Sequence, residues 1–234
     1  MQIIDLTRPM TRDTLIALGG RRVVEGWHTA EIELEWLRHW SRGDNGAQGR
    51  WTLGDHWGTH LDAPIHVLPN APAVDQVDLH RLMGEAVVLD CRFARGRGLT
   101  AADLEQAEPG VRPGDIVLLY TDEVPGTLDA FVTEQTYVTT DGAEWLVRQR
   151  VKAVGVEPSG FEHVYQRVVV DQCYRPEVEN PWPAHRICLA ADIYIIEGLT
   201  NLGAIAGERV QFSALPLPVP GSSGSPVRAV AWRT

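Results

Sequence analysis

Short apolar runs recur along the 234-residue chain, and most of them have the length of a β-strand. Their content of Val and Ile, and the Gly, Pro and Asp residues that flank them, are typical of strands. The predicted strands are Ile3–Leu6, Ala86–Leu89, Ile116–Tyr120, Val151–Val156, Ile193–Ile196, Ala214–Val219 and Val227–Trp232. The sequence Ser222–Ser225 separates the last two runs and predicts a hairpin loop.

Two segments have the features of short helices. Thr100 is a predicted N-cap for a helix at Ala101–Ala107, and Asp103 places an acidic side chain in its first turn. Asp141 is a predicted cap for Gly142–Arg150, where apolar residues recur at helical spacing on one face.

A weaker helical signal covers Ile32–Trp40, and the polar stretch Ser41–Gly49 after it predicts a loop. Many strands with few helices predict a mixed α/β protein, of the α+β type, in which sheet dominates. Because no linker-like stretch divides the chain, we expect residues 1–234 to form a single domain.

The formal net charge of −10 and the absence of a Lys/Arg-rich run argue against nucleic acid and anionic membranes as partners. No stretch has the roughly 18 apolar residues of a membrane span or the pattern of a signal peptide, so a cytoplasmic location is expected. Cys91, Cys173 and Cys188 are widely spaced and odd in number, which argues against a disulfide framework. We expect Cys91 and Cys188 to be buried thiols.

Histidine and aspartate are concentrated between Gly54 and His66, which contains three of the eight histidines. Imidazole and carboxylate together suit Zn²⁺, Mn²⁺ or Fe²⁺ better than Ca²⁺ or Mg²⁺. In an extended chain, residues 56, 60, 62 and 66 project from the same face of a strand. Pro64 disfavours a regular central strand, so the sequence predicts a strand end that bends into a loop.

The stretch His56–His66 matches every fixed position of the pattern HxGTHxDAPxH. That pattern is the signature of the kynurenine formamidase-like cyclase family of metal-dependent hydrolases, which this chain resembles. His185 lies twelve residues before Glu197, as it does in that family. Further segments that look like the family are Ile3–Thr7, Ile195–Leu202, Ala214–Leu217 and Gly224–Ala231, so the resemblance covers nearly the whole chain.

The resemblance implies a swivelling β/β/α domain that assembles as a homodimer or homotetramer. It assigns His56, His60 and Asp62 as ligands of a first metal ion. Asp62 and Glu197 match carboxylates that bridge to a second ion, which His185 also binds, and His66 matches the general acid/base. The implied cofactor is a divalent metal: one or two Zn²⁺, or Mn²⁺.

We therefore predict a hydrolase that cleaves a C–N amide bond in a small aryl formamide or cyclic amide. A bound divalent ion makes water reactive at neutral pH, and a histidine such as His66 can return a proton to the leaving amine. The alternatives are a lactone hydrolase, a metal-dependent lyase or cyclase, and a non-enzymatic metal-binding protein. A non-enzymatic metal-binding protein would be expected to lack the proton-transfer residue, yet His66 is present. The alternative role for His66 is that of a fourth metal ligand.

Other residues near the motif leave two interpretations open. Asp55 could orient a ligand histidine or simply form a turn, and the turn is slightly favoured. Trp57 could wall a pocket or pack in the core, and Trp182, between two prolines, could line the site or stiffen a loop. Glu157 follows a predicted strand, and we expect an exposed loop carboxylate there.

The family's usual pocket segments differ in this chain. The differences fall at Leu15–Gly20, Tyr120–Glu123 and Gly155–Gly160. The sequence therefore predicts the reaction class more strongly than the identity of the substrate.

Overall fold

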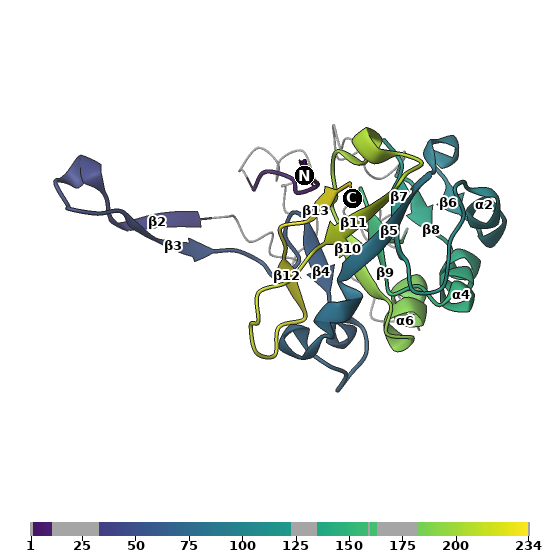
Figure 1. Cartoon of the computed structure of the whole chain (residues 1–234). Helices are drawn as coiled ribbons and strands as arrows, with labels where there is room; N and C mark the ends of the chain where they lie inside the picture. The colour runs from purple at the N-terminus through teal and green to yellow at the C-terminus, as the bar shows by residue number, and fades with distance from the viewer. Residues whose placement is uncertain (1, 11–32, 123–134, 159, 163–181, 234) are drawn as a thin grey trace.

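The computed structural model describes residues 2–10, 33–122, 135–158, 160–162 and 182–233. Nine strands form one curled, mixed sheet in the order β1-β13-β11-β5-β7-β9-β10-β4-β12 (Figure 1). Their bounds are β1 Ile3–Asp5, β4 His60–Asp62, β5 Met83–Asp90, β7 Ile116–Tyr120, β9 Ala153–Val156, β10 Tyr194–Glu197, β11 Arg209–Ser213, β12 Gly224–Pro226 and β13 Val230–Trp232. The predicted sheet-dominated, mixed α/β class is confirmed, whereas the swivelling arrangement and the single domain stay predictions.

The centre of the sheet consists of the parallel strands β5, β7, β9 and β10. Every residue of β7, β9 and β10 is buried, because a parallel strand is covered on both faces and reads as a continuous apolar run. Antiparallel strands extend this centre on both sides. The predicted burial of Cys91 and Cys188 in this core is confirmed, and Cys173 lies outside the described residues.

Three described α-helices are α2 Ala101–Gln106, α4 Thr140–Gln149 and α6 Pro183–Ala190. The side chain of Thr100 accepts a hydrogen bond from the Asp103 backbone N–H, and the Asp103 carboxylate accepts one from the Thr100 N–H. The predicted cap of α2 is therefore confirmed as a capping box.

Thr139, rather than the predicted Asp141, caps α4, and Asp141 instead accepts a hydrogen bond from the Ala101 N–H. The sequence does not predict the helix α6. Pro183 occupies its first turn, a position where the missing N–H costs no hydrogen bond.

Short elements complete the described chain. The 3₁₀-helices are η1 Trp40–Arg42, η2 Pro64–His66, η3 Val74–Gln76, η4 Leu79–Arg81, η5 Arg92–Ala94 and η6 Leu202–Ile205. The strand β6 (Gly98–Leu99) pairs with β8 (Tyr137–Val138), and β2 (Glu33–Arg38) pairs with β3 (Gln48–Thr52). In the described part of the chain no helix is long and apolar enough to cross a membrane.

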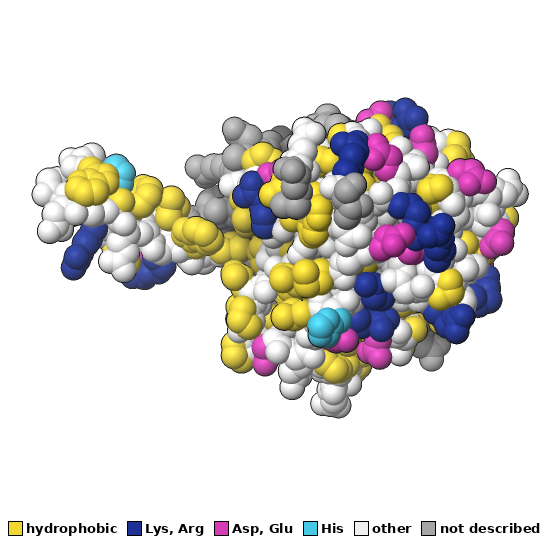
Figure 2. Space-filling view, in the orientation of Figure 1, with side chains coloured by type: hydrophobic (Ala, Val, Ile, Leu, Met, Phe, Trp, Pro, Cys, Tyr) yellow, Lys and Arg dark blue, Asp and Glu magenta, His cyan; other side chains and the backbone are white. Residues whose placement is uncertain are grey.

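The predicted helix at 32–40 is wrong, because residues 33–38 form the strand β2. Cross-strand pairing with β3 overrides the helical spacing of this segment. Residues 33–52, which we call the arm, extend away from the rest of the molecule as a two-stranded hairpin (Figure 1). Figure 2 shows hydrophobic side chains on the surface of the arm.

The predicted strand at 214–219 is also wrong. The strand β11 ends at Ser213, and Pro216 and Pro218 then remove backbone donors that a sheet requires. Pro216 keeps only an isolated bridge to Val227. The predicted hairpin loop at 222–225 is displaced toward the N-terminus, since β12 already begins at Gly224.

Candidate metal centre

The strand β4 places two of the predicted ligands on one face of the sheet. His60 and Asp62 are two residues apart, so their side chains project to the same side. In the antiparallel pairing with β10, His60 lies directly opposite Glu197. The shared parity predicted from the sequence is therefore confirmed for His60 and Asp62, and the register adds Glu197 to the same face.

Two imidazoles and two carboxylates surround one buried point. The His60 Nε2 atom lies 3.3 Å from Asp62 Oδ1 and 3.6 Å from Glu197 Oε2. The His185 Nε2 atom, supplied by α6, lies 3.3 Å from Asp62 Oδ2 and 3.4 Å from Glu197 Oε1. None of these four side chains is more than about 6% exposed, so the cluster is almost closed to solvent.

His56 and His66 complete the group from outside the strand. His56 precedes β4 in a bend, and its Nδ1 lies 2.7 Å from Asp62 Oδ1. The strand ends before Pro64, as predicted, and the chain bends into η2, whose last residue is His66. The ring centroid of His66 lies 4.1 Å from that of His56 and 5.7 Å from that of His185. All six predicted site residues are therefore brought together, while their individual roles stay predictions.

Five of the six residues form two groups of possible ligands that share Asp62. In one group, ligand atoms of His60, Asp62 and Glu197 lie within 4.8 Å of one another. In the other, those of His56, Asp62 and His66 do the same. The resemblance pairs His56 with His60 on one ion, whereas the geometry places His56 closer to His66. Because Asp62 belongs to both groups, the site could hold one metal ion or two ions bridged by the Asp62 carboxylate.

The charge balance of the cluster fits a divalent cation. Burial opposes protonation of His60, but the hydrogen bond to Asp62 and the charges of Asp62 and Glu197 outweigh it and raise the His60 pKa to about 9. Burial also opposes protonation of His185, yet its bonds to Asp62, Glu162 and Glu197 raise its pKa well above the usual value. The carboxylates of the cluster thus favour positive charge between them. Protonated imidazoles supply this charge, and a divalent ion bound by neutral imidazoles would supply it equally.

His66 has the opposite environment. Burial lowers the pKa of His66 to about 4, and the neighbouring His56 and His185 add to this effect. The charges of Asp62 and Glu197 oppose it without reversing it. The ring is therefore neutral near pH 7, and one ring nitrogen is free to accept a proton.

Glu162 is a site residue that the sequence reasoning missed. Its Oε1 lies 2.7 Å from His185 Nδ1, so the Nε2 of His185 faces Asp62 and Glu197. Glu162 also accepts hydrogen bonds from the Ala184 and His185 backbone N–H groups, which places its charge at the N-terminus of α6. A carboxylate behind a ligand histidine is a common arrangement in metal sites. A lone Glu in the sequence gives no sign of this, because only the fold brings it to His185.

The Gly58-Thr59 pair of the motif has a structural explanation. Gly58 has φ +63°, and Gly198, just after Glu197, has φ +70°. A Cβ at Gly198 would lie 2.4 Å from the Gly58 carbonyl oxygen, so the two backbones approach too closely for a side chain. Thr59 Oγ1 donates a 2.6 Å hydrogen bond to the Gly198 carbonyl. These contacts hold the two ligand-bearing segments together.

Asp55 and Ser223 support His56 from behind. His56 Nε2 lies 2.9 Å from Ser223 Oγ, which donates a 2.7 Å hydrogen bond to Asp55 Oδ2. Ser222 Oγ also donates to Asp55 Oδ2, over 3.1 Å. Asp55 lies in a bend, which agrees with its interpretation as a turn residue. Through Ser223 it also helps to orient the ring of His56.

Trp182 lies beside the cluster. Its ring centroid is 5.5 Å from that of His185 and 6.2 Å from that of His66. This position favours the pocket-lining interpretation over simple loop stiffening. Trp57 is half-buried, and both of its interpretations stay open.

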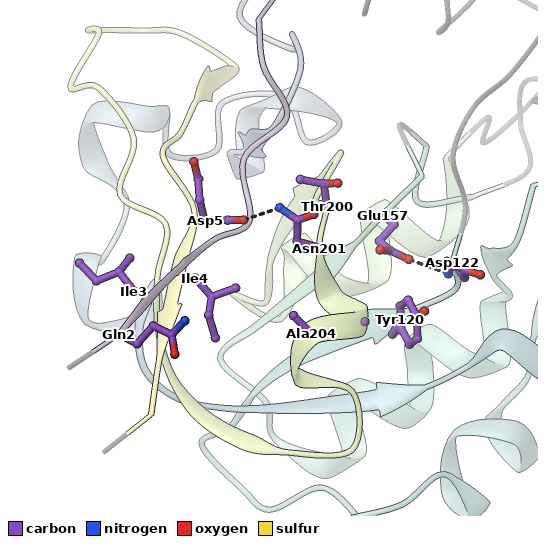
Figure 3. A pocket seen from close by; sticks show the side chains of 11 residues that line it. Gln2, Ile3, Ile4, Asp5, Tyr120, Asp122, Glu157, Thr200, Asn201 and Ala204 are labelled. Carbon is purple, nitrogen blue, oxygen red and sulfur yellow. Dashed lines mark hydrogen bonds between the residues drawn. The ribbon is translucent and has the colours of Figure 1, made fainter.

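A cavity of about 570 Å³ lies elsewhere, between β1 and the ends of β7 and β9 (Figure 3). Its lining includes Tyr120, Asp122, Glu157 and Asn201, and none of the predicted metal ligands. The prediction of an exposed Glu157 is wrong, since this residue is only 5% exposed. Its carboxylate accepts hydrogen bonds from the Thr121 and Asp122 N–H groups, which satisfies it after burial. Residues 15–20, another segment that differs from the family, lie outside the described residues.

The sheet-dominated fold and the buried cluster of imidazoles and carboxylates define a mixed α/β protein with a candidate divalent-metal centre. The family model Cyclase, described as "Putative cyclase", matches residues 4–163. The chain belongs to this family.

Distant relatives include kynurenine formamidases and an isatin hydrolase. The kynurenine formamidase of Erythrobacter litoralis is 28% identical over 203 residues, which cover 86% of this chain and 84% of the relative. The isatin hydrolase of Roseibium aggregatum is 27% identical over 224 residues, which cover 87% of this chain and 82% of the relative. Among solved structures, isatin hydrolase A from Ralstonia solanacearum superposes with a TM-score of 0.80 at 24% identity, covering 100% of this chain and 92% of that one.

Proposed function

We propose that this protein is a metal-dependent amidohydrolase that cleaves the C–N amide bond of a small aryl formamide or cyclic amide. One observation carries the proposal. The Nε2 atoms of His60 and His185 both lie within 3.6 Å of carboxylate oxygens of Asp62 and Glu197, although the four residues come from two distant stretches of the chain. Such convergence of imidazole and carboxylate in a buried place is typical of Zn²⁺ and Mn²⁺ sites.

The residues that would hold the metal are His56, His60, Asp62, His185 and Glu197. When bound, one or two Zn²⁺ or a Mn²⁺ would supply a Lewis acid that polarises the substrate carbonyl and makes water reactive at neutral pH. Glu162 fixes the ring of His185 through Nδ1, and Ser223 fixes the ring of His56 through Nε2. These contacts orient the ligand rings before any ion arrives.

His66 is proposed as the general acid/base. Its ring lies against His56 and near His185, and it is neutral near pH 7. A ring nitrogen of His66 can accept a proton from the attacking water and deliver it to the departing amide nitrogen. Delivery matters because an amide anion is a poor leaving group. A fourth metal ligand is the competing role, and metal analysis of a His66 variant separates the two.

Two observations support the proposed substrate class. The relatives named kynurenine formamidase and isatin hydrolase make an aryl formamide or a cyclic amide the first candidates. Trp182 adds an aromatic wall beside His66 and His185, suited to a flat ring. Small molecules, rather than nucleic acid or membrane, stay the predicted partners, and the cytoplasm stays the predicted location.

The test is a metal analysis of protein purified without chelator, followed by a screen of aryl formamides, lactams and lactones. We expect bound Zn²⁺ or Mn²⁺, turnover of a C–N substrate, and one ¹⁸O atom from labelled water in the product. The substitution His60→Ala should remove both metal and turnover. Turnover of lactones alone would identify an ester hydrolase. A product free of ¹⁸O would indicate a lyase or cyclase, and full metal and activity in His60→Ala would refute the proposed centre.

A further inference from the structure

A cavity of about 570 Å³ lies between β1 and the ends of β7 and β9, away from the candidate metal centre (Figure 3). Its volume is within the range of roughly 300–1,000 Å³ that small-molecule sites typically have. Tyr120, Asp122 and Glu157 line it, and all three belong to segments in which this chain differs from the family. The cavity therefore combines the space for a ligand with side chains that depart from the family pattern.

Glu157 brings a buried carboxylate with one unused oxygen to this cavity. The residue is only 5% exposed, and the three hydrogen bonds that support its carboxylate all end on Oε2. They come from the Thr121 N–H, the Thr121 hydroxyl and the Asp122 N–H, over 2.9, 3.3 and 2.8 Å. In the described part of the chain no donor reaches the other oxygen, Oε1. Burial raises the pKa of Glu157 in spite of these bonds, so a further donor from a ligand would stabilise the charged form.

The lining of the cavity carries negative charge. Asp5, Asp122 and Glu157 line it, and no Lys, Arg or His is among the described residues that do so. Arg228 neutralises Asp5 through an ion pair of 2.5 Å. Asp122 lies at the exposed rim, and neither it nor Glu157 has an ion pair with a described side chain. A positive group that enters the cavity therefore meets two carboxylates without a counterion.

The arginines that approach the cavity are engaged with other partners. The Cζ atom of Arg92 lies 5.1 Å from the centroid of the Tyr120 ring, but its Nε and Nη2 atoms donate to Asp90 over 2.9 and 2.7 Å. Arg8 Nη2 donates to the backbone carbonyl of Glu157 rather than to its carboxylate. A direct positive partner for the Glu157 carboxylate is therefore left to a bound molecule.

A primary ammonium group suits these acceptors better than a metal ion. Within the described chain, the side chains that lie close enough to share a metal form two groups, and both contain Asp62. Asp122 and Glu157 belong to neither group, so the cavity does not offer the three protein ligands of a zinc site. An ammonium group instead has three donors that separate acceptors can share. The carboxylates of Glu157 and Asp122 and the hydroxyl of Thr200 are such acceptors.

The opposite side of the cavity is apolar. Figure 3 shows Ile3 and Ile4 on the side of β1, across from Tyr120 and Glu157. Ile3 is 58% exposed, and covering an isoleucine side chain removes apolar surface from water. A ligand with an ammonium group at one end and an apolar body at the other matches both sides of the cavity.

We propose that this cavity is a second ligand-binding site, which takes a small molecule with a primary ammonium group and a compact apolar body. The ammonium group contacts Glu157 and Asp122, and the apolar body lies against Ile3 and Ile4. The proposal does not depend on the proposed function, because none of the predicted metal ligands lines the cavity. The two can therefore be tested separately.

The test is isothermal titration calorimetry of the full chain, as purified, with three small probes. The probes are 2-phenylethylammonium, the neutral 2-phenylethanol and the anionic phenylacetate. We expect the ammonium probe to bind about tenfold or more tightly than either of the others, because hydrogen bonds between charged groups are stronger than those between neutral ones. Absence of binding by the ammonium probe up to about 10 mM, or equal binding of the three probes, would overturn the proposal.

A charge variant and its control locate the bound probe. Glu157→Gln keeps one oxygen for the Thr121 and Asp122 N–H groups and replaces the other oxygen by an amide nitrogen that only donates. We expect it to weaken binding of the ammonium probe about tenfold or more, and that of 2-phenylethanol less than about twofold. The matched control is Glu144→Gln on α4, which removes the same charge from an exposed side chain away from the cavity (Figure 1). Both affinities should then equal those of the wild type.

A space-filling variant tests the site independently of charge. Ala204 is exposed in η6 and lines the cavity, so Ala204→Phe should occupy part of it and weaken both 2-phenylethylammonium and 2-phenylethanol. Circular dichroism checks that each variant keeps its fold. If Glu157→Gln unfolds the chain, Asp122→Asn replaces it, since Asn tolerates the left-handed backbone at φ +57°. Ammonium binding that survives every folded variant of the cavity would contradict its assignment to this place.

Discussion

His60 and His66 lie in the same cluster, yet their removal should have different consequences. His60 faces both Asp62 and Glu197, whereas the ring of His66 packs against that of His56. We expect His66→Ala to keep its metal while kcat falls on the order of 10²-fold or more. Metal content and steady-state kinetics measured on one preparation check this. Loss of the metal would make His66 a ligand, and wild-type kcat would remove it from the mechanism.

Ser223 is expected to act on the metal through His56. Its hydroxyl oxygen lies 2.9 Å from His56 Nε2 and 2.7 Å from Asp55 Oδ2, so Ser223 connects the ligand ring to the carboxylate of Asp55. Loss of a partner behind a ligand histidine typically costs about 10–100-fold in metal affinity. We predict a loss of this size for Ser223→Ala in a competition titration with a chromogenic chelator.

Ser222→Ala is the matched control for that titration. Ser222 Oγ lies 3.1 Å from Asp55 Oδ2 and 2.8 Å from the Gly224 carbonyl oxygen, so its single proton goes to one of these two acceptors and neither contact involves His56. Its removal should change metal affinity much less. Equal losses in the two variants would contradict a role of Ser223 in orienting His56.

At the scale of elements, the corner between β4 and β10 holds the ligands in register. Gly198→Ala introduces a Cβ 2.4 Å from the Gly58 carbonyl at a residue with φ +70°. We expect unfolding free energy to fall by about 1–3 kcal/mol from backbone strain, and metal affinity to fall with it. Gly207→Ala has a similar φ of +73° with no atom within 4 Å, so it controls for conformation alone. Urea unfolding compares them, and equal losses would mean that the contact with Gly58 is unimportant.

The cap of α2 supplies a pH-dependent contribution to stability. The hydrogen bond from Arg97, opposed by slight burial and assisted by Thr100, holds the pKa of Asp103 well below its usual value. A carboxyl with a lower pKa in the folded state stabilises the fold above its unfolded pKa of about 4, and this contribution disappears as the pH falls. We predict that Asp103→Asn lowers the melting temperature at pH 7 and that the difference narrows at pH 3. A difference independent of pH would contradict this role.

The sequence predicts the elements of this site unevenly. The alternation of His60 and Asp62 is a local property of a strand, and the capping box at Thr100 is a local property of a helix, so both could be predicted. The role of Glu162 depends on α6 bringing His185 to the segment that follows β9, and no local sequence pattern contains this contact. The helix predicted at 32–40 is wrong because pairing between β2 and β3, rather than periodicity within 33–38, decides the structure of this segment.

At the scale of the whole molecule, the sheet order explains why residues 56–66, 185 and 197 meet. The strand β4 is inserted between β10 and β12, so the motif lies beside the end of a parallel strand and faces α6. Ligands in α/β sheets commonly bind at the carboxyl ends of the strands, where Glu197 is found. The site is therefore a property of the assembled sheet, although its most recognisable residues form a single short motif.

The central claim is that His60, Asp62, His185 and Glu197 surround a divalent cation together with His56. Anomalous diffraction from a crystal of protein purified without chelator, collected at the absorption edge of the metal found by elemental analysis, tests it most directly. The account predicts a peak between the four buried side chains, with ligand nitrogens at about 2.0–2.1 Å if the ion is Zn²⁺. A map without a peak there, with the imidazoles bonded directly to the carboxylates, would contradict it.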